Sequence, residues 1–365
     1  MIGFSERPWL VAVLLMVSIV QCVNVALGSQ KVPAMFVFGD SIVDVGNNNY
    51  LRSYAKCNYP PYGIDYPGGP SGRFSNGKNI VDMLGDMLGL PSPPAYADPS
   101  TTGAKIVGGV NYASAAGGIL DETGRHYGEK YSLSQQVLNF ENTLNQLRTM
   151  LDGAALSRYL AGSIAVMVIG SNDYISNYLL PSLYPSSYTY SPQDYGNLLI
   201  NRYARQILAL NSVGLRKFFL AGIPPLGCIP NQRARSQYPD RCVDSVNQML
   251  GTFNEGLRSL VQQLNSNHPG SIFIYGNTYG AMGDILNNPA AYGFSVVDNA
   301  CCGIGRNQGE ITCIPFLVPC PDRTRQVFWD AFHLTQAASS VLTQRAFYGP
   351  PSDCYPINIQ QMAQL

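Results

Sequence analysis

The stretch AMFVFGDSIVDVGNNN, residues 34–49, joins a short apolar run to a polar loop that contains Ser41, two aspartates and three consecutive asparagines. Its first five residues, 34–38, are typical of a buried β-strand. Gly, Asp, Ser and Asn are also the residues that any tight turn after a strand would use. The stretch alone therefore leaves open whether Ser41 is a nucleophile at the end of a strand or a hydroxyl in a turn.

Further apolar runs rich in β-branched and aromatic residues follow at 105–113, 163–170, 216–222 and 271–276. Segments with helical periodicity, such as 132–151 and 195–214, lie between them. Strands that alternate with helices, each strand a nearly continuous apolar run, indicate an α/β fold with a parallel sheet covered on both faces. The ligand crevice of such a sheet lies outside the carboxyl ends of the strands, so the polar loops after the first three runs should converge there.

Composition excludes some functional classes. Of 365 residues, 46% are hydrophobic and 13% are charged, the formal net charge is zero and no long basic run occurs. Such a chain can bury a large core in one large domain or two smaller ones, and it lacks the electrostatic footprint that nucleic-acid binding requires. Asp40 and Asp44 could bind a metal in principle, but no further carboxylate or histidine cluster accompanies them. We expect hydrogen bonds within the loop for both, and no metal or organic cofactor.

Residues 1–28 have the pattern of a secretory signal peptide: an early arginine, an apolar run from Trp9 to Val20, and small residues near the expected cleavage site at Gly28. An uncleaved anchor is the alternative, because no charge interrupts residues 8–30 and that span could cross a bilayer. The polar segment that follows the short apolar run favours cleavage. We therefore predict a secreted, extracellular protein in which residues 29–365 form a single domain without a membrane span.

Loss of Cys22 with the signal would leave eight cysteines. An even number is what a full disulfide set requires, so the sequence predicts that they pair. The cluster within residues 301–320 could also be interpreted as a zinc site, but it lacks paired C-x-x-C spacing and a nearby histidine before His333. Cys228 and Cys242 are close enough for a local loop, whereas the pairing within the cluster cannot be deduced.

A serine nucleophile needs a general base, and the chain has only three histidines. His126 lies in a polar loop and His268 in a turn, so both should face solvent. His333 lies three residues after Asp330 in VFWDAFHLT, 327–335. The two could form a structural pair, but a carboxylate that accepts from one imidazole nitrogen also fixes the tautomer in which the other accepts a proton. Ser41, Asp330 and His333 are the candidate catalytic residues, and the absence of a G-x-S-x-G motif argues against the α/β-hydrolase fold.

Four blocks extend this interpretation: FGDS (38–41), NYASAAGG (111–118), GSND (170–173) and DAFH (330–333). In order and approximate spacing they resemble the blocks of the plant GDSL esterase/lipases within the SGNH hydrolases, over residues 34–348. The resemblance implies a flavodoxin-like three-layer α/β/α sandwich with a mainly parallel five-stranded sheet and a shallow site. It also implies that Ser41 attacks an ester carbonyl, that His333 accepts its proton, and that Asp330 orients the imidazole.

The resemblance further implies an oxyanion hole made by the backbone N–H of Ser41, a backbone N–H in the run SAAGG and the side-chain amide of Asn172. Gly117 is the predicted middle donor, and Ala116 and Gly118 are the alternatives, because the register of the small residues is ambiguous. Without the other blocks, Asn172 would be interpreted as a turn residue after a strand.

Two positions depart from the family pattern, since Ile42 stands where the family name has Leu and Leu334 stands where a proline is frequent. Ile42 keeps the apolar bulk, whereas Leu334 would loosen the start of the C-terminal helix. Arg73 is either a substrate contact or part of a structural ion pair.

The sequence thus predicts a secreted serine hydrolase that cleaves small-molecule or lipid carboxylic esters through an acyl-enzyme on Ser41. An acyltransferase, which passes the acyl group to a hydroxyl acceptor other than water, would use the same residues. A catalytically silent binding protein on the same fold is the alternative from another class. No residue selects among acyl lipids, acetylated sugars and phenolic esters, and none indicates an oligomeric state.

Overall fold

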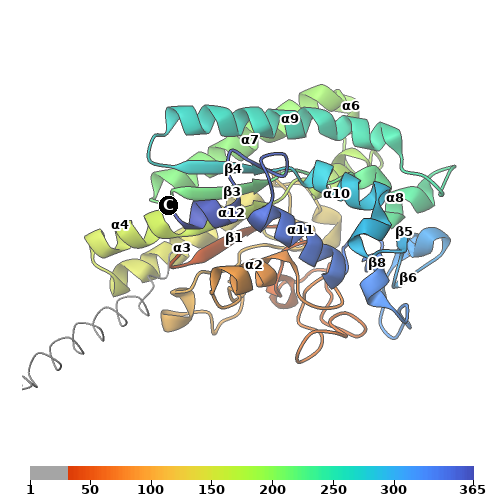
Figure 1. The fold of residues 1–365 in the computed structure, drawn as a ribbon, viewed down its shortest axis with the longest axis horizontal. Helices are drawn as coiled ribbons and strands as arrows, with labels where there is room; N and C mark the ends of the chain where they lie inside the picture. The colour runs from red at the N-terminus through yellow and green to blue at the C-terminus, as the bar shows by residue number, and fades with distance from the viewer. Residues whose placement is uncertain (1–31) are drawn as a thin grey trace, which may run out of the picture.

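A computed structural model describes residues 32–365 (Figure 1). The expected signal peptide, residues 1–28, lies outside the described residues. Within the described part of the chain, no helix is both long and apolar enough to span a membrane.

The central sheet has five strands in the order β1-β2-β3-β4-β9. Its members are β1 (Met35–Gly39), β2 (Ile164–Val168), β3 (Lys217–Ala221), β4 (Ile272–Gly276) and β9 (Cys354–Tyr355). The first four are parallel and in direct register, and the short β9 runs antiparallel to β4. The predicted mainly parallel five-stranded sheet is confirmed.

The run at 105–113 is not a strand, which corrects the prediction for that segment. It lies irregularly beside β1, where the Met35 amide donates to the Gly108 carbonyl at 3.2 Å and the Val37 amide donates to the Val110 carbonyl at 3.0 Å. Gly109 has a φ of +108°, and a Cβ there would lie 1.9 Å from the Met35 carbonyl oxygen. The glycine allows this close approach but interrupts the extended geometry that a strand needs. The fifth strand is therefore β9, a two-residue segment that no periodicity could reveal.

Alternation along the strands divides the core into two halves, because successive side chains of a strand point to opposite faces of the sheet. Phe36 and Phe38 of β1 pack in a cluster that includes residues of α3 (Leu133–Met150), α7 (Pro192–Ser212) and α9 (Asp244–Asn267). Met35 and Val37 pack on the other face with residues of α2 (Ile80–Leu88), α11 (Gln336–Tyr348) and α12 (Ile359–Ala363). The α9 and α11 helices lie on opposite sides of the sheet in Figure 1, so the three-layer α/β/α sandwich is confirmed.

Shorter elements complete the fold. They are α4 (Gly153–Gly162), α5 (Ser171–Asp173), α6 (Ser186–Thr189), α8 (Pro230–Arg235), α10 (Thr278–Asn287), the parallel pair β5 (Val296–Ala300) and β8 (Gln326–Phe328), and the antiparallel pair β6 (Gly303–Ile304) and β7 (Ile311–Thr312).

The described cysteines form three disulfides, Cys228–Cys242, Cys301–Cys320 and Cys302–Cys313. The local loop expected for the first pair is confirmed, and the cluster at 301–320 pairs with itself. The expectation that all eight cysteines pair is wrong, because Cys57 and Cys354 are buried free thiols. They belong to separate apolar clusters, Cys57 beside the 301–320 disulfides and Cys354 on the α2/α11 face of the sheet, so neither meets the other.

Candidate active site

Ser41 lies in the turn that directly follows β1. The Asp40 amide donates to the Val168 carbonyl of β2, and the Asp40 carbonyl accepts from the amides of Val43 and Asp44. This turn brings the partly exposed Ser41 side chain to the carboxyl edge of the sheet. Ser41 can therefore be both a residue of the turn and a candidate nucleophile, so the two interpretations of the sequence are compatible.

Carboxylates hold this loop against the segment 111–118. Asp44 accepts hydrogen bonds from the amides of Gly46 and Asn47, each at 2.7 Å, and from the Ala115 amide at 3.2 Å. Asp40 accepts from the Ile42 amide at 3.0 Å. Burial raises the pKa of Asp40 to about 7 and that of Asp44 to about 6. The hydrogen bonds expected within the loop are thus present, and no cluster of three or more potential metal ligands occurs among residues 32–365.

The three side chains singled out as a nucleophile, base and orienting acid are linked in one chain of hydrogen bonds. His333 Nε2 lies 2.8 Å from Ser41 Oγ, and His333 Nδ1 lies 2.8 Å from Asp330 Oδ1. Asp330 and His333 belong to the loop between β8 and α11, which folds around the carboxylate because the amides of Phe332 and His333 both donate to Asp330 Oδ1 at 2.8 Å. A base within hydrogen-bond reach of the hydroxyl, itself held by a carboxylate, is the arrangement that activates a serine.

Tyr62 completes the surroundings of Asp330, and sequence reasoning missed it. Its hydroxyl donates to Asp330 Oδ2 at 2.6 Å, and both side chains are buried. Burial would raise the pKa of Asp330, but the His333 ring and the hydrogen bonds from His333 and Tyr62 outweigh it and hold the pKa below its usual value. Burial and the nearby Asp330 raise the pKa of Tyr62 well above its usual value, so the phenol remains a donor. A tyrosine 268 residues away in sequence leaves no signal of this contact.

The other two histidines lie apart from this chain of hydrogen bonds. His126 is exposed, with its ring 2.8 Å from the Tyr184 hydroxyl, and His268 is partly exposed after α9. Arg73 forms a buried ion pair with Asp82, whose carboxylate it contacts at 2.7 Å through two nitrogens. The structural interpretation of Arg73 therefore accounts for its position.

Ser41, Ala116 and Asn172 line one cavity and carry N–H groups that are candidate donors to a developing negative charge. Asn172 Nδ2 donates one hydrogen to the Gly117 carbonyl at 3.1 Å, which leaves its second hydrogen free. The Gly117 amide donates to the Ser114 carbonyl at 3.0 Å, so it is already engaged. The amides of Ser41, Ala116 and Gly118 have no hydrogen-bond acceptor among residues 32–365. Ala116 has a φ of +64°, a conformation that is uncommon without glycine.

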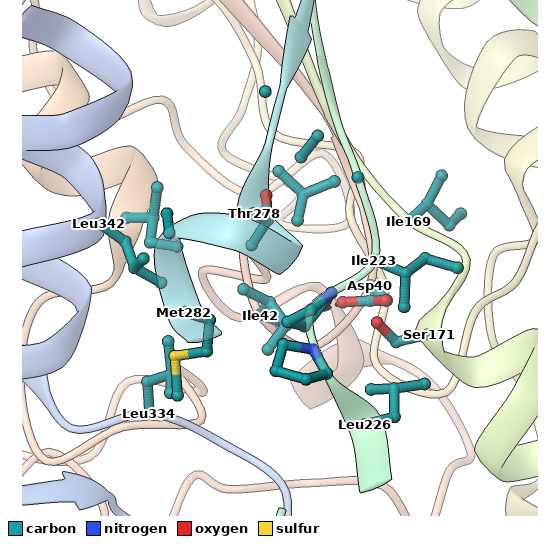
Figure 2. Close-up of a pocket in the computed structure, with 18 of the residues that line it drawn as sticks. Asp40, Ile42, Ile169, Ser171, Ile223, Leu226, Thr278, Met282, Leu334 and Leu342 are labelled. Carbon is teal, nitrogen blue, oxygen red and sulfur yellow. Dashed lines mark hydrogen bonds between the residues drawn. The ribbon is translucent and has the colours of Figure 1, made fainter. Parts of the chain in front are cut away.

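Two cavities meet at this point, and Ser41, Asn172, Ile175, Phe332 and His333 line both. The first is mainly apolar and crosses the carboxyl ends of the parallel strands (Figure 2). The second lies on the side of Ala116 and is lined by polar or amphipathic side chains that include Tyr54, Lys56, Tyr59, Tyr127 and Thr312. Ser41 thus borders two cavities, of which the first is mainly apolar and the second is more polar.

Comparisons with known proteins agree with the sequence blocks. The model of the GDSL-like lipase/acylhydrolase family matches residues 35–346. The GDSL esterase/lipase At1g71250 of Arabidopsis thaliana is 62% identical over 348 residues, which cover 95% of this chain and 93% of the relative. Two other proteins of that plant, the GDSL esterase/lipases At5g08460 and At1g29670, are 54% and 50% identical and are covered over 88% and 94% of their lengths. They match 91% and 93% of this chain.

Proposed function

Because the chain belongs to the GDSL-like lipase/acylhydrolase family and is a carboxylic ester hydrolase, we propose that it cleaves esters through an acyl-enzyme formed on Ser41. The observation that carries the proposal is the chain of hydrogen bonds from Ser41 through His333 to Asp330. Its substrates are small-molecule or lipid esters, which the family implies.

The residues have separate roles in the proposed mechanism. His333 Nε2 takes the proton of Ser41 Oγ while this oxygen attacks the ester carbonyl carbon, and Asp330 holds the Nδ1–H of the ring. The imidazolium then gives that proton to the alcohol oxygen as the carbon–oxygen bond breaks. Water, activated by the same His333 nitrogen, attacks the acyl-enzyme, releases the acid and restores Ser41.

The proposed oxyanion hole consists of the amides of Ser41 and Ala116 and the free hydrogen of Asn172 Nδ2. Ala116 replaces Gly117 in this role because the Gly117 amide already donates to Ser114. Ala116 is preferred to Gly118, whose amide also lacks an acceptor, because Ala116 lines the cavity that contains Ser41 and Asn172 and Gly118 lines neither cavity. Fixed donors around one oxygen stabilise the tetrahedral intermediate, since they need no reorganisation when the charge forms.

We further propose that residues 1–28 are a cleaved secretory signal, that residues 29–365 form a single domain, and that the protein acts outside the cell. The three disulfides support an oxidising compartment. N-terminal sequencing of the protein recovered from the culture medium of expressing plant cells tests this proposal. A mature N-terminus near residue 29 is expected, and retention of residues 1–28 on membranes would contradict it.

Ester hydrolysis by the Ser41→Ala variant tests the proposed nucleophile. With p-nitrophenyl acetate we expect its kcat to fall by about 10⁴-fold or more, as for loss of other serine nucleophiles. Ser266→Ala is the matched control, because Ser266 is an exposed serine of α9 that lines neither cavity. Its rate should change less than threefold.

A fluorophosphonate should also label wild-type protein at Ser41 and leave the Ser41→Ala variant unlabelled. Full activity in that variant, or labelling at another serine, would refute the proposed nucleophile. Hydrolysis in the presence of competing alcohols separates water from a hydroxyl acceptor, because an acyltransferase would form the new ester.

A further inference from the structure

We propose that the apolar cavity beside Ser41 binds the acyl chain of the ester, and that it selects fatty acyl groups of about eight to twelve carbons. This inference rests on the proposed function, since it takes Ser41 as the atom to which the acyl group is attached. It names a substrate class that the sequence left open.

The cavity begins at Ser41 and His333 and follows the carboxyl edge of the sheet. Residues from the end of β2, the end of β3 and the start of α10 after β4 line it in turn. In Figure 2, Ile169, Ile223 and Leu226 lie on one side, and Met282, Leu334 and Leu342 lie on the other. A chain esterified to Ser41 that enters this space is therefore enclosed by the strand ends on one side and by α10 and α11 on the other.

The difference in polarity between the two cavities indicates which half of an ester each one binds. The lining of the first cavity is mainly apolar, and burial of an alkyl chain between its isoleucine, leucine and methionine side chains removes apolar surface from water. The second cavity is more polar, because Lys56 and several tyrosines line it, and these side chains suit a polar group better than an alkyl chain. That cavity suits the alcohol half of the substrate, and His333 lies between the two, where it can protonate the departing alcohol oxygen.

The length of the cavity follows from the sheet. From the end of β1 to the end of β4 there are three strand spacings, each of about 4.8 Å, so the path is about 14 Å. An extended alkyl chain advances about 1.25 Å per carbon, given a C–C bond of about 1.5 Å, and about eleven carbons fill this distance.

Polar groups form the wall at the far end of the cavity. Arg345 forms a two-pronged ion pair with Asp353, with N–O distances of 2.7 and 3.0 Å, and both residues line the cavity. A longer chain would have to separate or desolvate this pair, which is costly. Acyl groups longer than about twelve carbons should therefore gain nothing further, because the apolar path of about 14 Å is already full.

A series of p-nitrophenyl esters from acetate to palmitate, used below their micelle concentrations, tests the proposal. We expect kcat/KM to rise about three- to fourfold per added methylene over the short esters, mostly through KM. It should reach a maximum between eight and twelve carbons and then fall. A profile that is flat or highest at acetate would overturn the inference, while the Ser41→Ala result on acetate still decides the proposed function.

Two variants test whether the acyl chain binds in this cavity. Ala281 and Leu342 line its far half on α10 and α11, so Ala281→Phe and Leu342→Trp should move the optimum to about four to six carbons. A circular dichroism spectrum and a melting temperature close to those of wild type would show that each variant is folded. Gln344→Trp is the control, because this residue of α11 is exposed and should leave the profile unchanged. An unchanged optimum in both cavity variants would overturn the inference.

Binding without turnover gives an independent readout. Decanoate titrated into the Ser41→Ala protein should bind with a negative heat-capacity change, the mark of apolar burial. Addition of Ala281→Phe should weaken that binding at least tenfold. Equal decanoate affinity with and without Ala281→Phe would place the chain elsewhere.

Discussion

The hydroxyl of Tyr62 offers a sharp test of how the candidate active site is held. Tyr62→Phe removes the donor that lies 2.6 Å from Asp330 Oδ2 and keeps the ring, which packs edge-on against Tyr59, Phe74 and Trp329. Hydrogen bonds to charged groups contribute about 1.5–3 kcal/mol, so the free energy of unfolding at pH 7 should fall by about that amount.

The effect on the rate should be much smaller than the loss of Asp330 itself. The carboxylate keeps the amides of Phe332 and His333 and the ring Nδ1–H, so its position is largely preserved. We expect kcat to fall by about three- to tenfold, which corresponds to no more than about 1.4 kcal/mol in the activation barrier. Tyr62 is thus a positioning residue that acts through Asp330.

The pH dependence distinguishes this role from simple packing. Asp330 has a pKa below its usual value in the folded protein, so its stabilising contribution is present above the unfolded pKa and disappears as pH falls through the folded pKa. Loss of the Tyr62 hydroxyl raises that pKa. Acid unfolding should therefore begin at a higher pH in Tyr62→Phe than in wild type.

Denaturant unfolding, acid unfolding and kcat at pH 7 measure these effects, and Tyr59→Phe is the matched control. Tyr59 is half-buried next to Tyr62, and its hydroxyl donates to the Cys313 carbonyl at 2.9 Å, not to Asp330. It should lose stability without a change in the pH dependence of acid unfolding. If Tyr62→Phe matches wild type in unfolding free energy and in the pH dependence of acid unfolding, the proposed support of Asp330 is refuted.

Three further predictions follow from the same geometry. Asn172→Ala should lower kcat by about 10²–10³-fold with little change in KM. A loss of less than tenfold would contradict the proposed role of the Asn172 amide in the oxyanion hole. Burial raises the pKa of Asp40 to about 7, so the folded protein binds the extra proton between about pH 4 and 7 and loses stability as pH rises through that range. Asp40→Asn should therefore raise the melting temperature more at pH 8 than at pH 5, and an equal change at both would contradict the buried carboxyl. Thiol titration of denatured, unreduced protein that begins near residue 29 should find the two thiols of Cys57 and Cys354, whereas none or eight would contradict the observed pairing.

Much of the fold could be predicted because its strands are buried on both faces. The runs around Phe36, Val166, Phe218 and Ile274 are almost continuously apolar, and continuous apolar runs between amphipathic helices indicate a parallel sheet. The run at 105–113 is also apolar and is therefore predicted to be a strand. Hydropathy does not reveal that the backbone of Gly109 lies too close to β1 for regular strand geometry. The strand β9 is too short to carry any periodic signal.

Some residues of the candidate site could likewise be predicted from the sequence, and others could not. Ser41, Asp330 and His333 follow from local blocks, because a base and its orienting acid can lie three residues apart on one loop. Tyr62 could not be predicted, since its contact with Asp330 arises only when distant loops pack together. The choice between Ala116 and Gly117 depends on which amide the turn leaves free, and this is a matter of backbone geometry, not of residue type. Similarly, an even number of cysteines does not show whether any two thiols lie close enough to form a disulfide.

The disulfide-bonded segment 301–320 has a bearing on when the enzyme becomes active during its biosynthesis. Its Cys302 amide donates to the Trp329 carbonyl at 2.8 Å, and its disulfides share a buried cluster with Tyr62 and Trp329 directly behind Asp330. A newly made chain with reduced thiols lacks the crosslinks that hold this backing in place. We therefore expect ester cleavage to appear only after these disulfides have formed, so that the reduced protein is inactive until it is oxidised.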